Sequence, residues 1–133
     1  MSIIPHFELS SEILDARTHV IHVKGEIHVS TAQEFAQRLD EAISQDATAI
    51  VLDLTEVEFI DSTGLSVLLT GLRSVTLRGG RLALAISNPT VLRLFEITRL
   101  DTTFDIVGSR EEAVQGVQSA SGDQAGESSD GAP

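Results

Sequence analysis

An acid, two hydroxyls and a glycine follow a segment that looks like a strand in the stretch "DLTEVEFIDSTGLSVLL", residues 53–69. These four residues are Asp61, Ser62, Thr63 and Gly64. An aspartate beside two hydroxyls could supply a catalytic acid and a nucleophile, cap a helix, or offer a hydroxyl to a protein kinase. The motifs in the rest of the chain distinguish these alternatives.

The catalytic motifs that share these letters are incomplete. Aspartic proteases use Asp-Thr/Ser-Gly, but Gly64 comes one residue too late for that pattern and the chain has no second copy of it. No G-x-S-x-G sequence surrounds Ser62, and neither G-x-x-x-x-G-K-[ST] nor G-x-G-x-x-G occurs. The sequence therefore predicts a protein that is not an enzyme.

The histidines and the lack of cysteine argue against a metal or another cofactor. His19 and His22 are three residues apart on a predicted strand, so their side chains should point to opposite faces of the sheet. That is poor geometry for a shared metal ion. The chain contains no Cys, so it has no thiolate ligand, thiol nucleophile or disulfide. We expect no cofactor.

The charge of the chain restricts its partners. Twenty acids against nine bases give a net charge of -11, which disfavours nucleic acid and anionic membrane surfaces as partners. The start, "MSIIPHFELS", lacks the pattern of a secretory signal, and no apolar stretch is long enough to span a membrane. We expect a cytoplasmic protein that does not insert into the membrane.

Short apolar runs predict the strands that would position residues 61–64. Residues 17–24 alternate between apolar and polar, as in a half-exposed strand, and Gly25 should end it. Residues 47–54, "ATAIVLDL", form a continuous apolar run, which is typical of a central strand with both faces covered. The other predicted strands lie around residues 6–10, at 81–86 and at 103–108.

The predicted helices begin at recognisable caps. Ser30 or Thr31 should cap the first helix, and Thr31 with Glu34 has the pattern of a capping box. Asn88 followed by Pro89 should begin another. A last helix is predicted at 109–118 with Ser109 as its cap. Three earlier helices are indicated by residues at helical spacing: Phe35, Leu39 and Ile43 in the first; Leu65, Leu68, Leu69, Leu72 and Thr76 in the second; and Val91, Leu94 and Phe95 in the third.

The alternation of strands and helices predicts an α/β fold in a single domain, residues 1–118. Its sheet should be mixed but mostly parallel, with an antiparallel first hairpin, and should be covered by helices. Residues 119–133 contain three acids, no base and no large apolar residue, so we expect a disordered acidic tail rich in Gly and Ser. A modest docking segment is the alternative for this tail.

Residues 61–64 should therefore lie at the carboxyl end of a parallel strand, where open α/β sheets place their sites. Ser62 could simply cap the helix that follows. One good cap is sufficient, however, and three polar residues are present. Asp61 fits either a structural acid at the positive helix end or a contact that positions Ser62 or pairs with a partner's cation. Gly64 more naturally permits close backbone approach than takes part in chemistry.

The chain resembles the STAS domain of bacterial anti-sigma factor antagonists. The stretches that carry the resemblance are "KGEIHVSTAQEF", "FIDSTGLSVLL" and "ISNPTVLRLFEITRLDTTFDIVGSREEAV", in the same order and at compatible spacings. The likeness covers residues 6–118 and leaves only the tail outside. The resemblance implies a small α/β fold and a regulator that switches partners.

The resemblance also assigns roles to residues. In this family the Ser directly after the Asp accepts phosphate from an anti-sigma factor that is also an ATP-dependent serine kinase. Ser62 has that position, with Thr63 as the secondary candidate. Gly25 and Glu26 match a family turn whose loop lies beside the phosphorylation site, which makes Glu26 and Ser30 secondary candidates for the interface. The residues expected to contact the partner are Asp61, Ser62, Thr63, Gly64, Glu26 and Ser30.

Three functions remain open at this point. The first is an anti-sigma factor antagonist that binds the anti-sigma factor when unphosphorylated and thereby releases a sigma factor. A phosphatase is a further partner that such a cycle would involve. The second is a STAS subunit of a transporter or stress-signalling assembly in which Ser62 only caps its helix. The third is a STAS module that senses a nucleotide or lipid ligand.

Overall fold

The strands of the computed structural model, which describes residues 7–119, form one five-stranded sheet. Their order in the sheet is their order in the chain: β1 (Phe7–Ile13), β2 (Thr18–Ile27), β3 (Ala49–Ile60), β4 (Arg81–Ala85) and β5 (Asp105–Val107). β1 runs antiparallel to β2, and the other neighbouring strands are parallel. The predicted mixed, mostly parallel sheet with an antiparallel first hairpin and a central third strand is confirmed.

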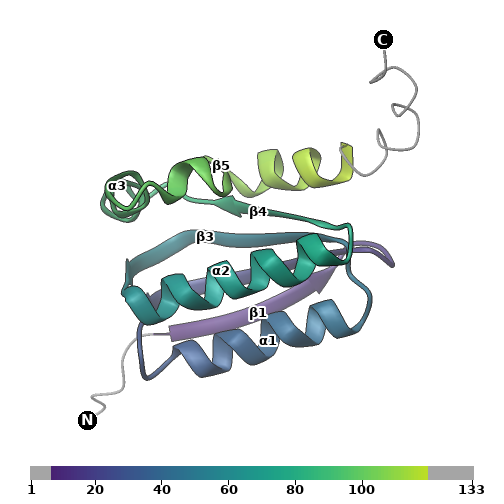
Figure 1. The fold of residues 1–133 in the computed structure, drawn as a ribbon, viewed down its shortest axis with the longest axis horizontal. Helices are drawn as coiled ribbons and strands as arrows, with labels where there is room; N and C mark the ends of the chain where they lie inside the picture. Colours follow the sequence, from purple (N-terminus) through teal and green to yellow (C-terminus); the bar gives the residue numbers. More distant parts are fainter. Residues whose placement is uncertain (1–6, 120–133) are drawn as a thin grey trace.

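The helices cover both faces of this sheet. They are α1 (Ala32–Ser44), α2 (Ser62–Leu77), α3 (Pro89–Ile97) and a last helix at 110–119, with a short 3-10 turn, η1 (Leu100–Thr102), after α3. α1 and α2 lie side by side, whereas the last helix runs beyond β4 (Figure 1). The predicted tail lies outside the described residues except for Ser119, which belongs to the last helix.

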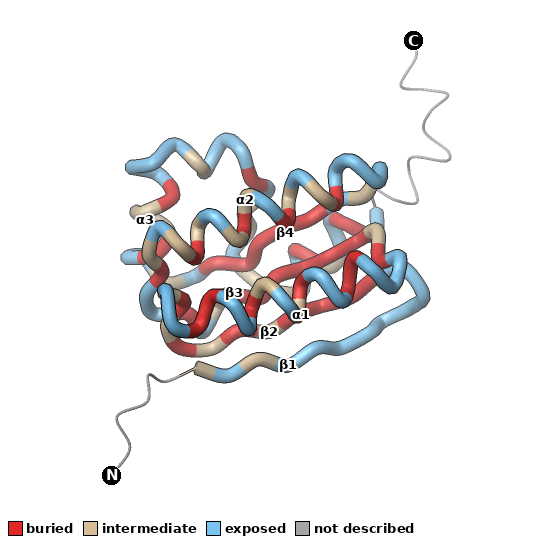
Figure 2. Tube along the Cα trace, turned by 60° about the horizontal axis from the view of Figure 1, so that its bottom comes forward, coloured by how far each residue is buried: buried red, intermediate tan, exposed pale blue. Residues whose placement is uncertain are grey.

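Alternate residues of the central strands build two apolar layers. Ile50, Leu52 and Leu54 of β3 pack in a large core with the apolar residues of α1 and α2. Ala49 and Val51, on the other face of the same strand, pack with the last helix through small residues such as Ala113. β3 and β4 are buried along most of their length, whereas β1 forms an exposed edge (Figure 2). Most core side chains are aliphatic, but Phe35, Phe95 and Phe104 are also buried in it.

Two strand ends differ from the sequence prediction. Gly25 does not end β2, because the strand continues to Ile27 across shifts of register on both sides of Lys24 and Gly25. Gly25 has a φ of 104°, a backbone conformation that suits glycine, so it bends the strand instead of terminating it. β1 is also longer than predicted and ends at Ile13. His19 and His22 do lie on opposite faces, since His19 is buried whereas His22 reaches Glu56 at 2.9 Å.

α2 turns the predicted apolar face toward the core, except at its last position. Leu68 is fully buried, and Leu65, Leu69 and Leu72 are partly buried and pack against the core, whereas Thr76 is exposed. The fully buried residues also include Gly64, Gly71 and Val75, which the spacing of apolar residues did not indicate. A Cβ added at Gly71 would overlap the side chain of Leu39 on α1, so the glycines let α2 approach its neighbours closely.

The close packing around Gly64 can be tested by adding a side chain at this position. A Cβ at this position would lie 2.7 Å from Ile60 Cγ1 and 2.8 Å from Ile27 Cγ2. We expect Gly64→Ala to lower the free energy of unfolding by about 1–3 kcal/mol because the side chain overpacks the junction, even though Ala favours a helix. Urea denaturation followed by circular dichroism would measure this change.

The matched control is Gly116→Ala in the last helix, where an added Cβ meets no atom within 4 Å among the described residues. This variant should gain up to about 1 kcal/mol from helix propensity alone. An equal gain in stability for Gly64→Ala would contradict the close approach described here.

Candidate functional site

The candidate site lies where β2 and β3 end side by side. Ile27 pairs with Ile60 in the parallel register, and the backbone N–H of Asp61 donates to the carbonyl of Ile27 at 3.0 Å. The chain leaves β2 into the loop 28–31 and leaves β3 directly into α2. Both segments therefore start from the same edge of the sheet, as the sequence predicts for the carboxyl ends of parallel strands.

Asp61, and not Ser62, caps α2. A carboxylate oxygen of Asp61 accepts hydrogen bonds from the backbone N–H groups of Thr63 at 2.9 Å and Gly64 at 3.0 Å. Asp61 has the extended backbone that an N-cap requires, and its charge faces the positive end of the helix. The reading of Ser62 as the cap is wrong, and the reading of Asp61 as a structural acid at the helix end is confirmed.

Ser62 is consequently free of a structural task. It is the first residue of α2 and is exposed, and within residues 7–119 no hydrogen bond holds its hydroxyl. Thr63 is half-buried and Gly64 is buried. Because Gly64 has no side chain, the first turn of α2 packs directly against Ile27. This packing fixes the position of Ser62 relative to the end of β2.

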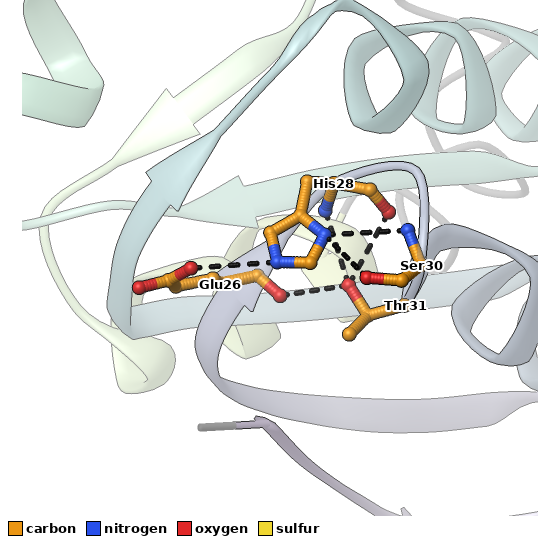
Figure 3. Close-up of polar contacts among 4 residues, drawn as sticks. All are labelled: Glu26, His28, Ser30 and Thr31. Atoms are coloured by element: carbon orange, nitrogen blue, oxygen red, sulfur yellow. Dashed lines mark hydrogen bonds and ion pairs between the residues drawn. The ribbon is translucent and has the colours of Figure 1, made fainter. Parts of the chain in front are cut away.

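Thr31 ties the neighbouring loop together. It has the N-cap position of α1, but its side chain makes no capping hydrogen bond, so the predicted capping box with Glu34 does not form. The hydroxyl instead donates to the carbonyl of Glu26 at 2.8 Å and accepts from the N–H of His28 at 3.0 Å (Figure 3). Because Glu26 lies at the end of β2 and His28 in the loop, Thr31 fixes the loop to the strand and leaves the helix N-terminus uncapped by its side chain.

His28 connects Glu26 at the end of β2 with Ser30 in the loop, two residues that were predicted to contact a partner. Its Nδ1 accepts from the N–H of Ser30 at 3.3 Å and lies 3.0 Å from the Ser30 hydroxyl (Figure 3). Since Nδ1 accepts, we assign the ring proton to Nε2, which faces Glu26 Oε1 at 3.4 Å. The structure thus brings Glu26 and Ser30 together around His28, which was not among the residues predicted to contact a partner.

Exposed apolar side chains accompany the polar residues. Phe59 on β3 is 48% exposed and Val29 in the loop is 74% exposed. The rings of His28 and Phe59 lie 6.4 Å apart between centroids, so the two segments share one surface. The sequence analysis missed Phe59, although its place just before "IDSTG" and beside the exposed Glu58 was the available signal.

Comparison with known proteins identifies the family. The STAS domain family model matches residues 12–113. An anti-sigma-B factor antagonist of Listeria monocytogenes is 36% identical over 100 residues, which are 74% of this chain and 88% of that protein. The anti-sigma-B factor antagonist of Bacillus subtilis is 34% identical over 95 residues, 71% of this chain and 86% of that protein. The chain therefore belongs to the STAS domain family, among relatives that are anti-sigma factor antagonists.

Solved structures support the same assignment. An anti-sigma factor antagonist from Mycobacterium paratuberculosis aligns with a TM-score of 0.79 at 27% identity over 89% of this chain and 99% of that chain. The unphosphorylated form of the antagonist SpoIIAA aligns with a TM-score of 0.72 at 27% identity, over 86% and 97% of the two chains. The phosphorylated form of SpoIIAA from Bacillus aligns with a TM-score of 0.65 at 26% identity, over 84% of this chain and 99% of that chain.

Residues 7–119 contain no group of three or more His, Cys, Asp or Glu side chains that could hold a metal ion. No helix in this range is long and apolar enough to cross a membrane.

The capping arrangement predicts distinct effects of neighbouring substitutions. Asp61→Ala should lower the free energy of unfolding by about 0.5–2 kcal/mol, whereas Asp61→Asn should retain most of the cap. Ser62→Ala removes a hydroxyl without a partner and should change stability by less than about 0.5 kcal/mol. Thermal and urea unfolding of the three variants would compare them. A loss for Ser62→Ala as large as that for Asp61→Ala would show that Ser62 shares the cap.

The hydrogen bonds of the Thr31 hydroxyl predict a difference in stability between two substitutions of this residue. Thr31→Val keeps the shape of this buried side chain but removes its hydroxyl, and we expect a loss of about 1–3 kcal/mol because the bonds to Glu26 and His28 disappear. Thr31→Ser keeps the hydroxyl and is the control, with a smaller loss. Urea denaturation measures both, and wild-type stability of Thr31→Val would argue against the hydroxyl as the element that ties the loop.

Proposed function

We propose that this protein is an anti-sigma factor antagonist whose binding to an anti-sigma factor is controlled by phosphorylation of Ser62. The observation that carries the proposal is that Ser62 lies exposed at the first turn of α2, while Asp61 does the capping. A hydroxyl with no structural role can be modified without cost to the fold. The antagonists named among the relatives, and the solved phosphorylated and unphosphorylated forms of one neighbour, support this reading.

Ser62 is a better phosphate acceptor than Thr63. Ser62 is exposed, whereas Thr63 is half-buried and its N–H is already bonded to Asp61. A kinase must surround the acceptor hydroxyl, so exposure is the first requirement. Thr63 remains the secondary candidate.

Phosphate on Ser62 would add charge that the helix terminus cannot fully absorb. Helix N-terminal N–H groups often bind phosphate, but the Asp61 carboxylate already occupies those of Thr63 and Gly64. The phosphate, with about -1.5 to -2 charges, would therefore stay solvated beside the Asp61 carboxylate. In a closed interface it would have to lose water next to a like charge, which disfavours the complex. The modification then acts as a binding switch.

The partner implied by this mechanism is an anti-sigma factor with ATP-dependent serine kinase activity, which the unphosphorylated chain binds so that a sigma factor is released. A phosphatase would restore the binding form. The contact surface would include Asp61 to Gly64, Glu26 and Ser30, together with the exposed Phe59 and Val29. The chain itself acts by binding and not by catalysis, and its place of action is the cytoplasm.

The capping role that the subunit alternative assigned to Ser62 does not agree with the structure, because Asp61 is the cap. We therefore give priority to the antagonist. Incubation with the purified anti-sigma factor and labelled ATP should transfer phosphate to wild type and to Thr63→Ala, but not to Ser62→Ala. Ser62→Ala should still bind the anti-sigma factor, and Ser62→Asp should fold normally but bind at least about tenfold more weakly.

The melting temperature of each variant serves as the control for folding. Phosphate uptake by Ser62→Ala at the wild-type rate, together with unchanged affinity of Ser62→Asp, would remove Ser62 from the mechanism.

A further inference from the structure

A groove runs between α1 and α2 and begins beside the phosphorylation site proposed above. It has a volume of about 240 Å³. Its apolar part is formed by Ala36 and Leu39 of α1 and by Val67 and Gly71 of α2. The groove exists because the side chains here are small, and because Leu39 fills the space that a Cβ at Gly71 would take. The two helices are thus in contact on their buried faces, and the groove lies on their solvent-facing side.

The polar lining of the groove comes from both helices. Thr63, Ser66 and Thr70 of α2 and Asp40 of α1 line it, and each of their side chains can accept hydrogen bonds. Asp40 is exposed, and no Lys or Arg within the described residues pairs with it or lines the groove. An apolar groove with one unpaired carboxylate and three hydroxyls favours a ligand that is apolar along its length and cationic at its end.

We propose that this groove binds an arginine side chain of the anti-sigma factor, an inference that rests on the function proposed above. The aliphatic part of the arginine would lie on Leu39 and Val67, and the guanidinium would donate to Asp40 and the nearby hydroxyls. Arginine fits better than lysine because its planar group carries five donors for several acceptors. Arginine is also enriched among the side chains that dominate protein interfaces.

Charge and position support the same occupant. The chain carries a net charge of -11, so a partner with a basic surface would be attracted over a distance as well as at the groove. Thr63, at one end of the groove, directly follows Ser62 in the first turn of α2. A partner that covers Ser62 would therefore reach the groove without a second docking surface.

The test is a calorimetric titration of the purified anti-sigma factor with wild type and variants. Asp40→Asn removes the carboxylate charge and should weaken binding at least about threefold. Thr70→Leu keeps the charge but fills the groove and should weaken binding by a similar factor. Glu111→Gln is the matched control, because it removes one exposed acid from the last helix on the other face of the sheet and should leave affinity unchanged.

Substitution of the exposed arginines of the anti-sigma factor to alanine identifies the occupant. One of them should weaken binding to wild type but have a much smaller effect on Asp40→Asn, as expected when two residues act as a pair. Coupling of Asp40 to a lysine, with none to an arginine, would overturn the assignment of the side chain.

The two proposals fail in different ways. Wild-type affinity of Asp40→Asn and Thr70→Leu, with weakened binding of Ser62→Asp, would overturn the groove and leave the antagonist function intact. Wild-type affinity of Ser62→Asp would overturn the switch that the groove inference rests on. Melting curves of all variants show whether a loss of affinity comes from a loss of folding.

Discussion

The carboxylate of Asp61 is the interaction on which the site depends. It accepts the N–H groups of Thr63 and Gly64, while the backbone N–H of Asp61 donates to Ile27. These bonds join the end of β3, the end of β2 and the start of α2 into one rigid corner. Because the Asp61 side chain already accepts hydrogen bonds from these N–H groups, Ser62 is not needed as the helix cap. The exposed hydroxyl of Ser62 is the result.

Close packing gives that corner its fixed position. Gly64 brings the first turn of α2 against Ile27 and Ile60, and Gly71 brings the middle of the helix against Leu39. The same closeness leaves a groove on the outer side of α1 and α2, so one structural cause places both the proposed phosphate acceptor and the proposed arginine site. A partner would meet a preformed surface, which lowers the entropy that binding must overcome.

Much of the fold could be predicted because periodicity and caps are local signals. The continuous run at 47–54 predicted the central strand, and Asn88 with Pro89 predicted the start of α3. The rest depends on distant contacts. Asp61 caps α2 in place of Ser62, and the hydroxyl of Thr31 bonds to the carbonyl of Glu26. Both arrangements depend on where β2 ends. The burial of Gly71 in α2 depends on its contact with Leu39 of α1, which no count of apolar positions along α2 could reveal.

Phosphate on Ser62 should change binding to the anti-sigma factor and leave the fold intact. The decisive experiment is a titration of the anti-sigma factor with the phosphorylated chain and with the unphosphorylated chain, under identical salt and temperature. Phosphorylation should weaken the affinity by more than about a hundredfold, as expected for a desolvated charge beside Asp61, while the unfolding curves of the two forms should nearly coincide. Equal affinities for the two forms would contradict it.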